Sequence, residues 1–255
     1  MISRYEVSLN NLQMSEIDSS LLVLDVNYAD PSYSIDSTKV GGRDGAVILN
    51  ETKESANVTI SFELHIYSIA ERQRVCQLVN AWAKDGGVLR INDRPAQRLH
   101  CKCSRLASVA SAKNWTDPLT IVFSGFQPPY WEDDTATEIE LSGTNESALG
   151  AVPGNGKEAY VSCIVIPEDT LTHLTLKAGA SIFELTGLSI PAGETVSVDY
   201  QEGVLRIRHG NSSILGSRTG SSSDDLKVPC GQESTFAVIA DVAVDATFSV
   251  RGCWT

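Results

Sequence analysis

The chain has 255 residues, with 20 Lys or Arg against 32 Asp or Glu, so its net charge is -12. Hydrophobic residues make up 42% of the sequence and charged residues 20%, a composition that indicates a folded globular protein more than a disordered chain. The length suits one large β domain or two domains of ordinary size. The acidic balance argues against general nucleic-acid binding, because neutralising phosphates requires clustered Lys and Arg.

Neither an export signal nor a membrane span is predicted. The first residues alternate polar and apolar side chains instead of forming the apolar core of a signal peptide, and the sequence has no run of 18 apolar residues. We therefore expect folding in the cytoplasm, where the six cysteines are expected to be reduced. Cys76, Cys163 and Cys253 are interpreted as packing residues.

Residues 27–56 form a long segment with little hydrophobic periodicity. Asp30-Pro31, Gly41-Gly42 and Gly45 interrupt it. Long excursions from a compact domain are usually functional or disordered. We predict a projecting hairpin or arm that grips a neighbouring subunit.

The next segment predicts a half-buried strand followed by a helix. Apolar residues alternate with polar ones over residues 58–66. Ser68 and Glu71 have the spacing of a capping box, and Gly86-Gly87 predicts a left-handed stop. Between these signals, apolar residues recur at i, i+3, i+4 and i+7, namely Val75, Leu78, Val79 and Trp82. The pattern predicts one amphipathic helix, with Trp82 in the core.

Short strands then lead to a change in charge. The apolar segments are residues 88–91, 99–106 and 119–126. Residues 1–131 carry 13 basic and 14 acidic residues, a balance of -1, whereas residues 132–255 carry 7 and 18, a balance of -11. Pro128 and Pro129 lie at this change and disfavour both helix and sheet ladder. We place a domain boundary between residues 131 and 132.

The second half, residues 132–255, predicts only strands. Alternating apolar segments are separated by turns rich in Gly, Asn, Asp and Ser, and they cover residues 160–166, 171–176, 182–185, 195–200, 204–207, 235–239 and 247–250. Short strands at this spacing are typical of a β-sandwich. The sequence therefore predicts a mainly β protein with one α-helix.

No catalytic site, cofactor site or metal site is predicted. The four histidines lie near no nucleophile motif, and the nucleophile elbow, zinc-protease and phosphate-loop motifs are all missing. Cys101 and Cys103 share a strand face, but no second pair completes a zinc site. Adjacent carboxylates lack the spacing of a calcium loop. A carbohydrate-binding or adhesin sandwich is the alternative function, although most aromatic positions of the second half look buried.

Motifs along the whole chain resemble, in order and spacing, the distal tail protein family of long-tailed bacteriophages. They are the helix Ala70 to Ala83, Gly86-Gly-Val-Leu89, Asp93-Arg-Pro95, Leu119-Thr-Ile-Val-Phe123, Pro129-Tyr-Trp131, Gly154-Asn-Gly156 and Leu226-Lys-Val-Pro-Cys-Gly231. The resemblance implies an N-terminal ring-forming domain that is a β-sandwich or barrel, residues 1–131, and a C-terminal galectin-like β-sandwich, residues 132–255. It also implies a structural protein without enzymatic activity.

The resemblance further implies a place in the virion. The family forms a hexameric ring at the tail tip, one ring or two stacked, assembled in the bacterial host cytoplasm. The ring joins the tail tube protein to the tail-associated hub protein, and the sandwich carries receptor-binding or baseplate proteins. DNA passes through the lumen without specific binding, so we expect a neutral or acidic lumen. A chain of 255 residues leaves no room for the inserted carbohydrate-binding module of larger members.

Five residues are candidates for a subunit or domain interface. Arg43 and Asp44 lie in the glycine-rich turn of the predicted arm, which lacks the lysine of a phosphate loop. Trp115 lies in a polar loop, and Tyr130 and Trp131 follow the two prolines. Aromatic residues are enriched at interfaces. The alternative for Trp115 and Trp131 is a hinge packed inside one subunit.

Overall fold

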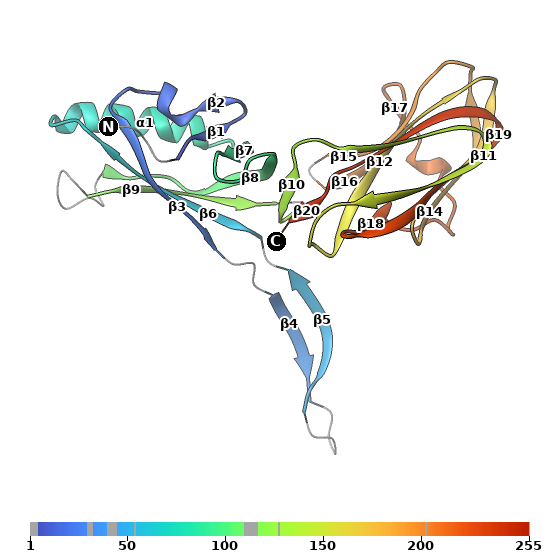
Figure 1. The fold of residues 1–255 in the computed structure, drawn as a ribbon, viewed down its shortest axis with the longest axis horizontal. Coiled ribbons are helices and arrows are strands. Elements are labelled where there is room, and N and C mark those ends of the chain that lie inside the picture. The colour runs from blue at the N-terminus through green and yellow to red at the C-terminus, as the bar shows by residue number, and fades with distance from the viewer. Residues whose placement is uncertain are drawn as a thin grey trace. The chain divides into compact units, whose positions relative to one another are not determined.

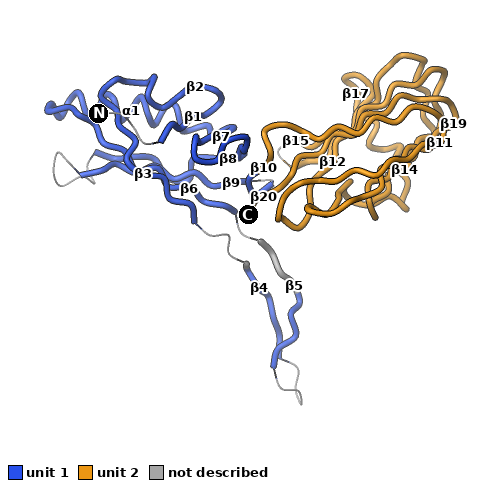
Figure 2. Tube along the Cα trace, viewed as in Figure 1, with its two compact units in different colours: residues 1–131, 255 blue, residues 132–254 orange. Residues whose placement is uncertain are grey.

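The computed structural model describes residues 5–29, 33–39, 45–53, 55–109, 117–126, 128–201 and 203–254 (Figure 1). These residues divide between two compact units, unit 1 (residues 1–131) and unit 2 (residues 132–254) (Figure 2). In the described part of the chain the fold is mainly β with one α-helix, which confirms the predicted fold class. Each unit has its own buried apolar core.

Unit 1 is built on an antiparallel sheet in the order β2-β1-β7-β8-β9-β6-β3. Its strands are β1 (Val7–Leu9), β2 (Leu12–Gln13), β3 (Leu21–Ala29), β6 (Asn57–Leu64), β7 (Gly87–Ile91), β8 (Gln97–Arg105) and β9 (Leu119–Gly125), and the 3-10 helix η1 (Met14–Glu16) follows β2. In β6 the even-numbered residues are buried and the odd-numbered ones are not. The predicted half-buried strand is confirmed.

Helix α1 (Ile69–Ala83) covers the apolar face of this sheet. Trp82 packs edge-to-face on the fully buried Phe123 of β9, with 6.0 Å between ring centroids. Its indole N–H donates to the Leu12 carbonyl at 3.2 Å, so one side chain joins the helix to both β9 and β2. Trp82 itself is half-buried and does not lie fully in the core, where the sequence predicted it. The buried residues of the helix are Arg72, Val75, Cys76, Val79 and Ala83.

Two details of the helix prediction were wrong. Ser68 is the N-cap but its side chain makes no capping hydrogen bond. The Glu71 Oε1 atom instead accepts two hydrogen bonds from the Arg74 guanidinium, at 2.9 and 2.7 Å, because charge-assisted hydrogen bonds compete well with one from a backbone amide. Leu78 is 40% exposed, since the buried stripe runs through Cys76 and Val79 instead.

The predicted left-handed stop after α1 is confirmed. Gly86 and Gly87 have φ angles of +70° and +139°. A Cβ on Gly86 would lie 2.2 Å from the Cys101 carbonyl oxygen. The Asn10 side chain closes the same corner by donating to the Gly86 carbonyl and accepting from the Val88 N–H. The helix end therefore touches β8 directly.

Unit 2 is a β-sandwich formed by one continuous nine-stranded sheet, in which the long strands β11 (Thr137–Val152) and β19 (Gln232–Val250) run through both layers. The first part of β19 pairs with β13 and the last part with β12. A register shift between Gly143 and Asn145 bends β11 where β19 changes partner, which is how a strand passes from one layer to the other. The other elements are β12 (Glu158–Pro167), β13 (Leu171–Ala178), β14 (Ser181–Ile190), β15 (Val196–Gln201), β16 (Val204–His209), β17 (Ser212–Ser213), η3 (Leu215–Ser217) and β18 (Lys227–Pro229).

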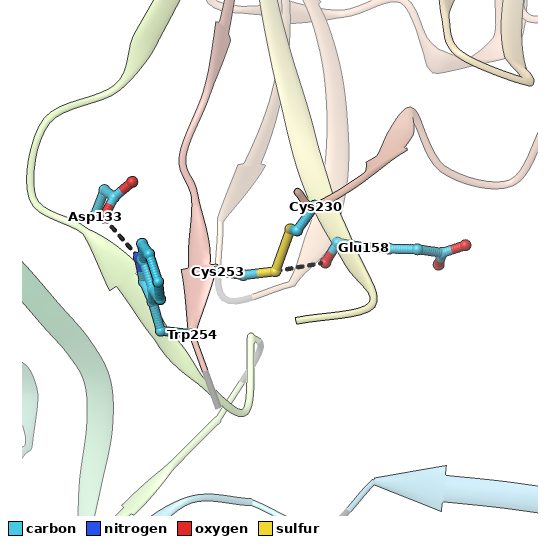
Figure 3. Close-up of a disulfide and its surroundings, with 5 residues drawn as sticks. All are labelled: Asp133, Glu158, Cys230, Cys253 and Trp254. Atoms are coloured by element: carbon cyan, nitrogen blue, oxygen red, sulfur yellow. Dashed lines mark hydrogen bonds between the residues drawn. A yellow bond between two sulfur atoms is a disulfide. The ribbon is translucent and has the colours of Figure 1, made fainter. Parts of the chain in front are cut away.

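Hydrogen bonds join the first and last residues of unit 2 (Figure 3). Strand β10 (Trp131–Asp133) leads into the unit and β20 (Cys253–Trp254) ends it. The Asp133 N–H donates to the Gly252 carbonyl, and the Trp254 indole N–H donates to the Asp133 carboxylate at 2.7 Å. A disulfide joins Cys253 to Cys230, with 6.5 Å between the Cα atoms.

The disulfide corrects the expectation that Cys253 is a reduced packing residue. The two cysteines are 23 residues apart, and only the return of β20 beside the turn after β18 brings them together. Gly156 permits this approach, because a Cβ there would lie 2.3 Å from the Cys253 sulfur. Cys76, Cys101 and Cys163 are free and buried, as expected for packing residues.

The close approach at Gly86 predicts a large cost for Gly86→Ala. The new methyl group would meet backbone atoms of Cys101 and Lys102 at 2.2 and 2.7 Å, and the left-handed backbone adds strain. We expect urea unfolding to show unit 1 destabilised by more than about 2 kcal/mol. Gly193→Ala is the control, because Gly193 has φ +77° and an open surrounding, and should cost about 1 kcal/mol. Equal effects would contradict the proposed clash.

The disulfide predicts that unit 2 is less stable under reducing conditions. Breaking a cross-link that spans 23 residues should lower the free energy of unfolding by about 3 kcal/mol. Thermal unfolding with and without a thiol reductant measures this difference. Cys253→Ala is the control, since that variant should no longer respond to the reductant. A wild-type protein that also ignores the reductant would refute the prediction.

Candidate subunit interface

Strands β4 (Tyr33–Thr38) and β5 (Val47–Lys53) form an antiparallel hairpin, which we call the arm (Figure 1). The two strands make a separate two-stranded sheet. Cross-strand pairing of Ser37 with Ile48, after a register irregularity at Asp36 and Ser37, puts Ile48 on the same face as Ile35. The arm is thus a hairpin with its own side-chain pattern.

The arm exposes large apolar side chains. Ile35 is 55% exposed, Ile48 60%, Leu49 61% and Val47 42%. An isolated two-stranded hairpin buries too little apolar surface to be stable in water. Clustered exposed apolar residues usually mark an interaction site. The exposed apolar side chains of the arm are therefore suited to burial against another protein surface.

The arm begins and ends beside the last residues of unit 1. Its return segment reaches Ala56, whose N–H donates to the Pro129 carbonyl at 3.0 Å and whose carbonyl accepts from the Gly125 N–H at 2.7 Å. On the other side, Tyr28 near the end of β3 packs edge-to-face on Trp131, with 5.8 Å between the ring centroids. Both sides of the arm base thus contact the segment of residues 129–131.

The Arg94 guanidinium lies against both of these rings. It is 4.5 Å from the centroid of Tyr28 and 5.1 Å from that of Trp131, within the range of cation–π attraction. The Tyr28 hydroxyl donates to the Asp93 carboxylate. Burial, followed by this hydrogen bond, raises the pKa of Tyr28, so the phenol stays neutral and keeps donating.

The candidate interface residues fall into two groups. Arg43, Asp44 and Trp115 lie outside the described residues. Tyr130 is half-buried and Trp131 is 3% exposed. Trp131 thus packs inside unit 1 of a single chain, which is the geometry of the hinge alternative. Its role at a subunit or domain interface stays a prediction.

Sequence reasoning did not single out Tyr28 or Arg94 as site residues. Asp93-Arg-Pro95 is one of the motifs of the family resemblance, and nothing local shows that its cation reaches Trp131. The arm's apolar residues were also missed as candidates, although Val47, Ile48 and Leu49 form an apolar run between the turn and the strand end. Such a run was the available signal.

The richest polar cluster of unit 2 surrounds Glu184. Its carboxylate accepts hydrogen bonds from Thr219 at 2.9 Å and Ser221 at 3.0 Å, and lies 3.3 Å from His173 Nε2. These bonds, that of Thr219 foremost, lower the pKa of Glu184. In a hydrolytic triad the histidine lies between hydroxyl and carboxylate, whereas here the carboxylate lies between histidine and hydroxyls. The cluster ties the 219–222 segment to β14.

The described residues show no candidate metal centre and no activated thiol at Cys101 or Cys163. They contain no group of three or more His, Cys, Asp or Glu side chains placed to hold a metal ion. Burial raises the pKa of the Cys101 thiol to about 12 and also raises that of Cys163, so neither thiol is an available nucleophile at neutral pH. Among the helices of the described chain, none is long and apolar enough to cross a membrane.

The aromatic residues of unit 2 give little support to sugar stacking. Phe183, Phe236 and Phe248 are fully buried. Tyr160 and Tyr200 pack on each other with 4.7 Å between ring centroids, and the Lys227 ammonium lies 4.9 Å from the Tyr160 ring. A glycan-binding face needs exposed rings, and these rings are used in packing.

Comparisons with known proteins show which solved structures have a similar fold. The sequence matches no protein-family model and no curated protein. Among solved structures, the crystal structure of SPP1 Dit (gp 19.1), described as a hub adsorption apparatus of phages that infect Gram-positive bacteria, aligns with a TM-score of 0.71. The match covers 96% of this chain and 98% of that chain at 12% identity.

A second match is a chain of the phage P2 baseplate in its activated conformation, with a TM-score of 0.50 and 10% identity over 99% of this chain and 98% of that one. At such identities a structural likeness is evidence of shared fold. The neighbours are structural components of phage hubs and baseplates, as the sequence resemblance implied. The chain therefore has the fold of a phage distal tail (Dit) protein.

Proposed function

We propose that this protein is the hub of a phage or prophage tail tip, a structural component without enzymatic activity. The single observation that carries the proposal is the fold likeness to SPP1 Dit, which extends over 96% of the chain and so includes both units. Domain roles follow from it: unit 1 assembles the hub, and the galectin-like sandwich of unit 2 carries other tail components. The protein would assemble in the host cytoplasm and reside at the virion tail tip.

We propose a hexameric ring made by unit 1. A closed ring requires a head-to-tail interface in which one surface of a subunit meets a different surface of the next. The arm suits such an interface, because Ile35 and Ile48 are exposed on one face of a hairpin that cannot cover them itself. In this arrangement each arm lies on the neighbouring subunit and buries these side chains there.

The proposed partners follow from the place of the hub. The ring would receive the tail tube protein on one side and the tail-associated hub protein on the other, and unit 2 would carry receptor-binding or baseplate proteins. DNA would pass through the lumen without specific binding. The net charge of -12 fits that role, because the ring must not hold the phosphate backbone.

The proposal predicts the mass of the protein in solution. Light scattering should give about 165 kDa, six times the chain mass of 27.5 kDa, or twice that for two stacked rings. Negative-stain images of the same peak should show rings. A chain that remains a monomer at high concentration, even with tube and hub partners added, would contradict the hexamer.

If the arm holds the neighbouring subunit, substitutions in the arm should prevent assembly without preventing folding. We expect Ile35→Asp combined with Ile48→Asp to give folded monomers, because both side chains are already exposed in the single chain but would be buried in the ring. Losing two buried isoleucines should weaken each subunit contact by about a hundredfold or more. Circular dichroism checks the fold and light scattering checks the assembly.

Leu149→Asp is the matched control for the arm variant, since Leu149 is 69% exposed on β11 of unit 2. It should leave the rings intact. Deleting residues 30–50 is the stronger version and should also give folded monomers. Rings that survive the deletion would show that the arm does not hold the neighbouring subunit.

A further inference from the structure

The two sides of the arm base and the segment leading out of unit 1 meet at one place. We call residues 129–131 the exit segment, because unit 2 begins at residue 132. Strand β3 reaches the arm through Tyr28, and the arm returns through Ala56. Ala56 is bonded to the exit segment through its backbone and Tyr28 through its ring. Segments that are remote in sequence are therefore joined here.

Arg94 is the residue that contacts both aromatic rings of this junction. Its backbone is fixed in the turn between β7 and β8, because its N–H donates to the Ile91 carbonyl at 3.0 Å and its carbonyl accepts from the Gln97 N–H at 3.2 Å. The planar guanidinium can stack on aromatic faces. A cation fixed to a sheet turn thus reaches Tyr28 of the arm base and Trp131 of the exit segment.

We propose that Arg94 is a positioning residue that joins the base of the arm to the exit segment, so that the two behave as one joint. The proposal concerns contacts inside unit 1 and does not require the ring. Within a ring, however, it has a consequence: a neighbour that captures the arm would also restrain the segment that leads into unit 2. Docking and the placement of unit 2 would then be linked.

The hydrogen bond from the Tyr28 hydroxyl to the Asp93 carboxylate already holds Tyr28 to the turn that carries Arg94, but the contacts from the arm base to the exit segment are individually weak. The Tyr28–Trp131 edge contact and the Ala56–Pro129 hydrogen bond each contribute modestly. A guanidinium shared by two rings adds attraction to both at once, and more strongly because Trp131 is only 3% exposed. Removing the cation should therefore loosen the arm base and the exit segment together.

Amide hydrogen exchange of the full chain, measured at single residues by NMR, tests whether Arg94 joins the arm base to the exit segment. The reporters are the Ala56 and Gly125 amides, which donate to Pro129 and Ala56 respectively. In Arg94→Ala we expect both to exchange about tenfold faster than in the wild-type protein. The Asn10 amide, which donates to the Val88 carbonyl, should keep its rate, because it lies at the end of the β1–β7 pair opposite to the Arg94 turn.

Arg90→Ala is the matched control, an arginine on β7 whose guanidinium donates to Asn11 at 3.0 Å. It should leave the Ala56 and Gly125 amides unchanged. Arg94→Lys keeps the positive charge but loses the planar guanidinium group that stacks on the rings, so exchange should accelerate to an intermediate extent. This variant replaces Arg94→Ala in the experiment if Arg94→Ala does not fold. Unchanged reporter amides in both Arg94 variants would overturn the proposal.

A uniform increase across the whole sheet would also overturn it, since Arg94 would then be a general stabilising residue. A double-mutant cycle distinguishes the two roles. Tyr28→Leu and Trp131→Leu should be coupled in their effect on the reporter amides in the wild-type background, and that coupling should fall in the Arg94→Ala background. If the coupling persists in the Arg94→Ala background, the direct contact between the aromatic side chains of Tyr28 and Trp131 would account for it, and Arg94 would not be needed. All these measurements stand whether or not the protein forms rings.

Discussion

Burial of one apolar face of the unit 1 sheet is the interaction on which the rest of that unit depends. A sheet with one apolar face needs a second layer, and α1 supplies it. Trp82 fixes the distance between the layers through Phe123 and holds β2 through the Leu12 carbonyl. The helix can end directly against β8 only because Gly86 has no side chain. The arm lies outside this arrangement, and its apolar residues remain exposed.

The contrast between core and arm is the physical basis for the proposed assembly. Within the unit 1 sheet, strands such as β6 bury every second side chain. In the arm the same kinds of residue, Ile35 and Ile48, lie on a hairpin without a second layer in the described part of the chain. Exposed apolar surface of this kind is stable in a complex and costly in an isolated chain. The arm base, by contrast, is tightly tied through Ala56, Tyr28 and Arg94.

The stability of unit 2 depends on long strands that continue through both layers of the sandwich. Because β11 and β19 run through both layers, the two layers belong to one continuous sheet. Its first and last strands are held by the Asp133–Trp254 hydrogen bond and by the disulfide of Cys230 and Cys253. These contacts close the unit where the chain enters and leaves it. The polar cluster at Glu184 fixes a loop through hydrogen bonds, and its order of groups differs from that of a hydrolytic triad.

The sequence by itself determined the elements whose signals are local. Alternation in β6, the helix before Gly86 and the succession of short strands in unit 2 were readable because side-chain period follows backbone geometry within a few residues. Only the tertiary structure decided the pairing of Cys230 with Cys253 and the meeting of Tyr28, Arg94 and Trp131. Each of these depends on which competing partner the folded chain brings nearest, and the spacing of residues along the sequence does not encode that distance.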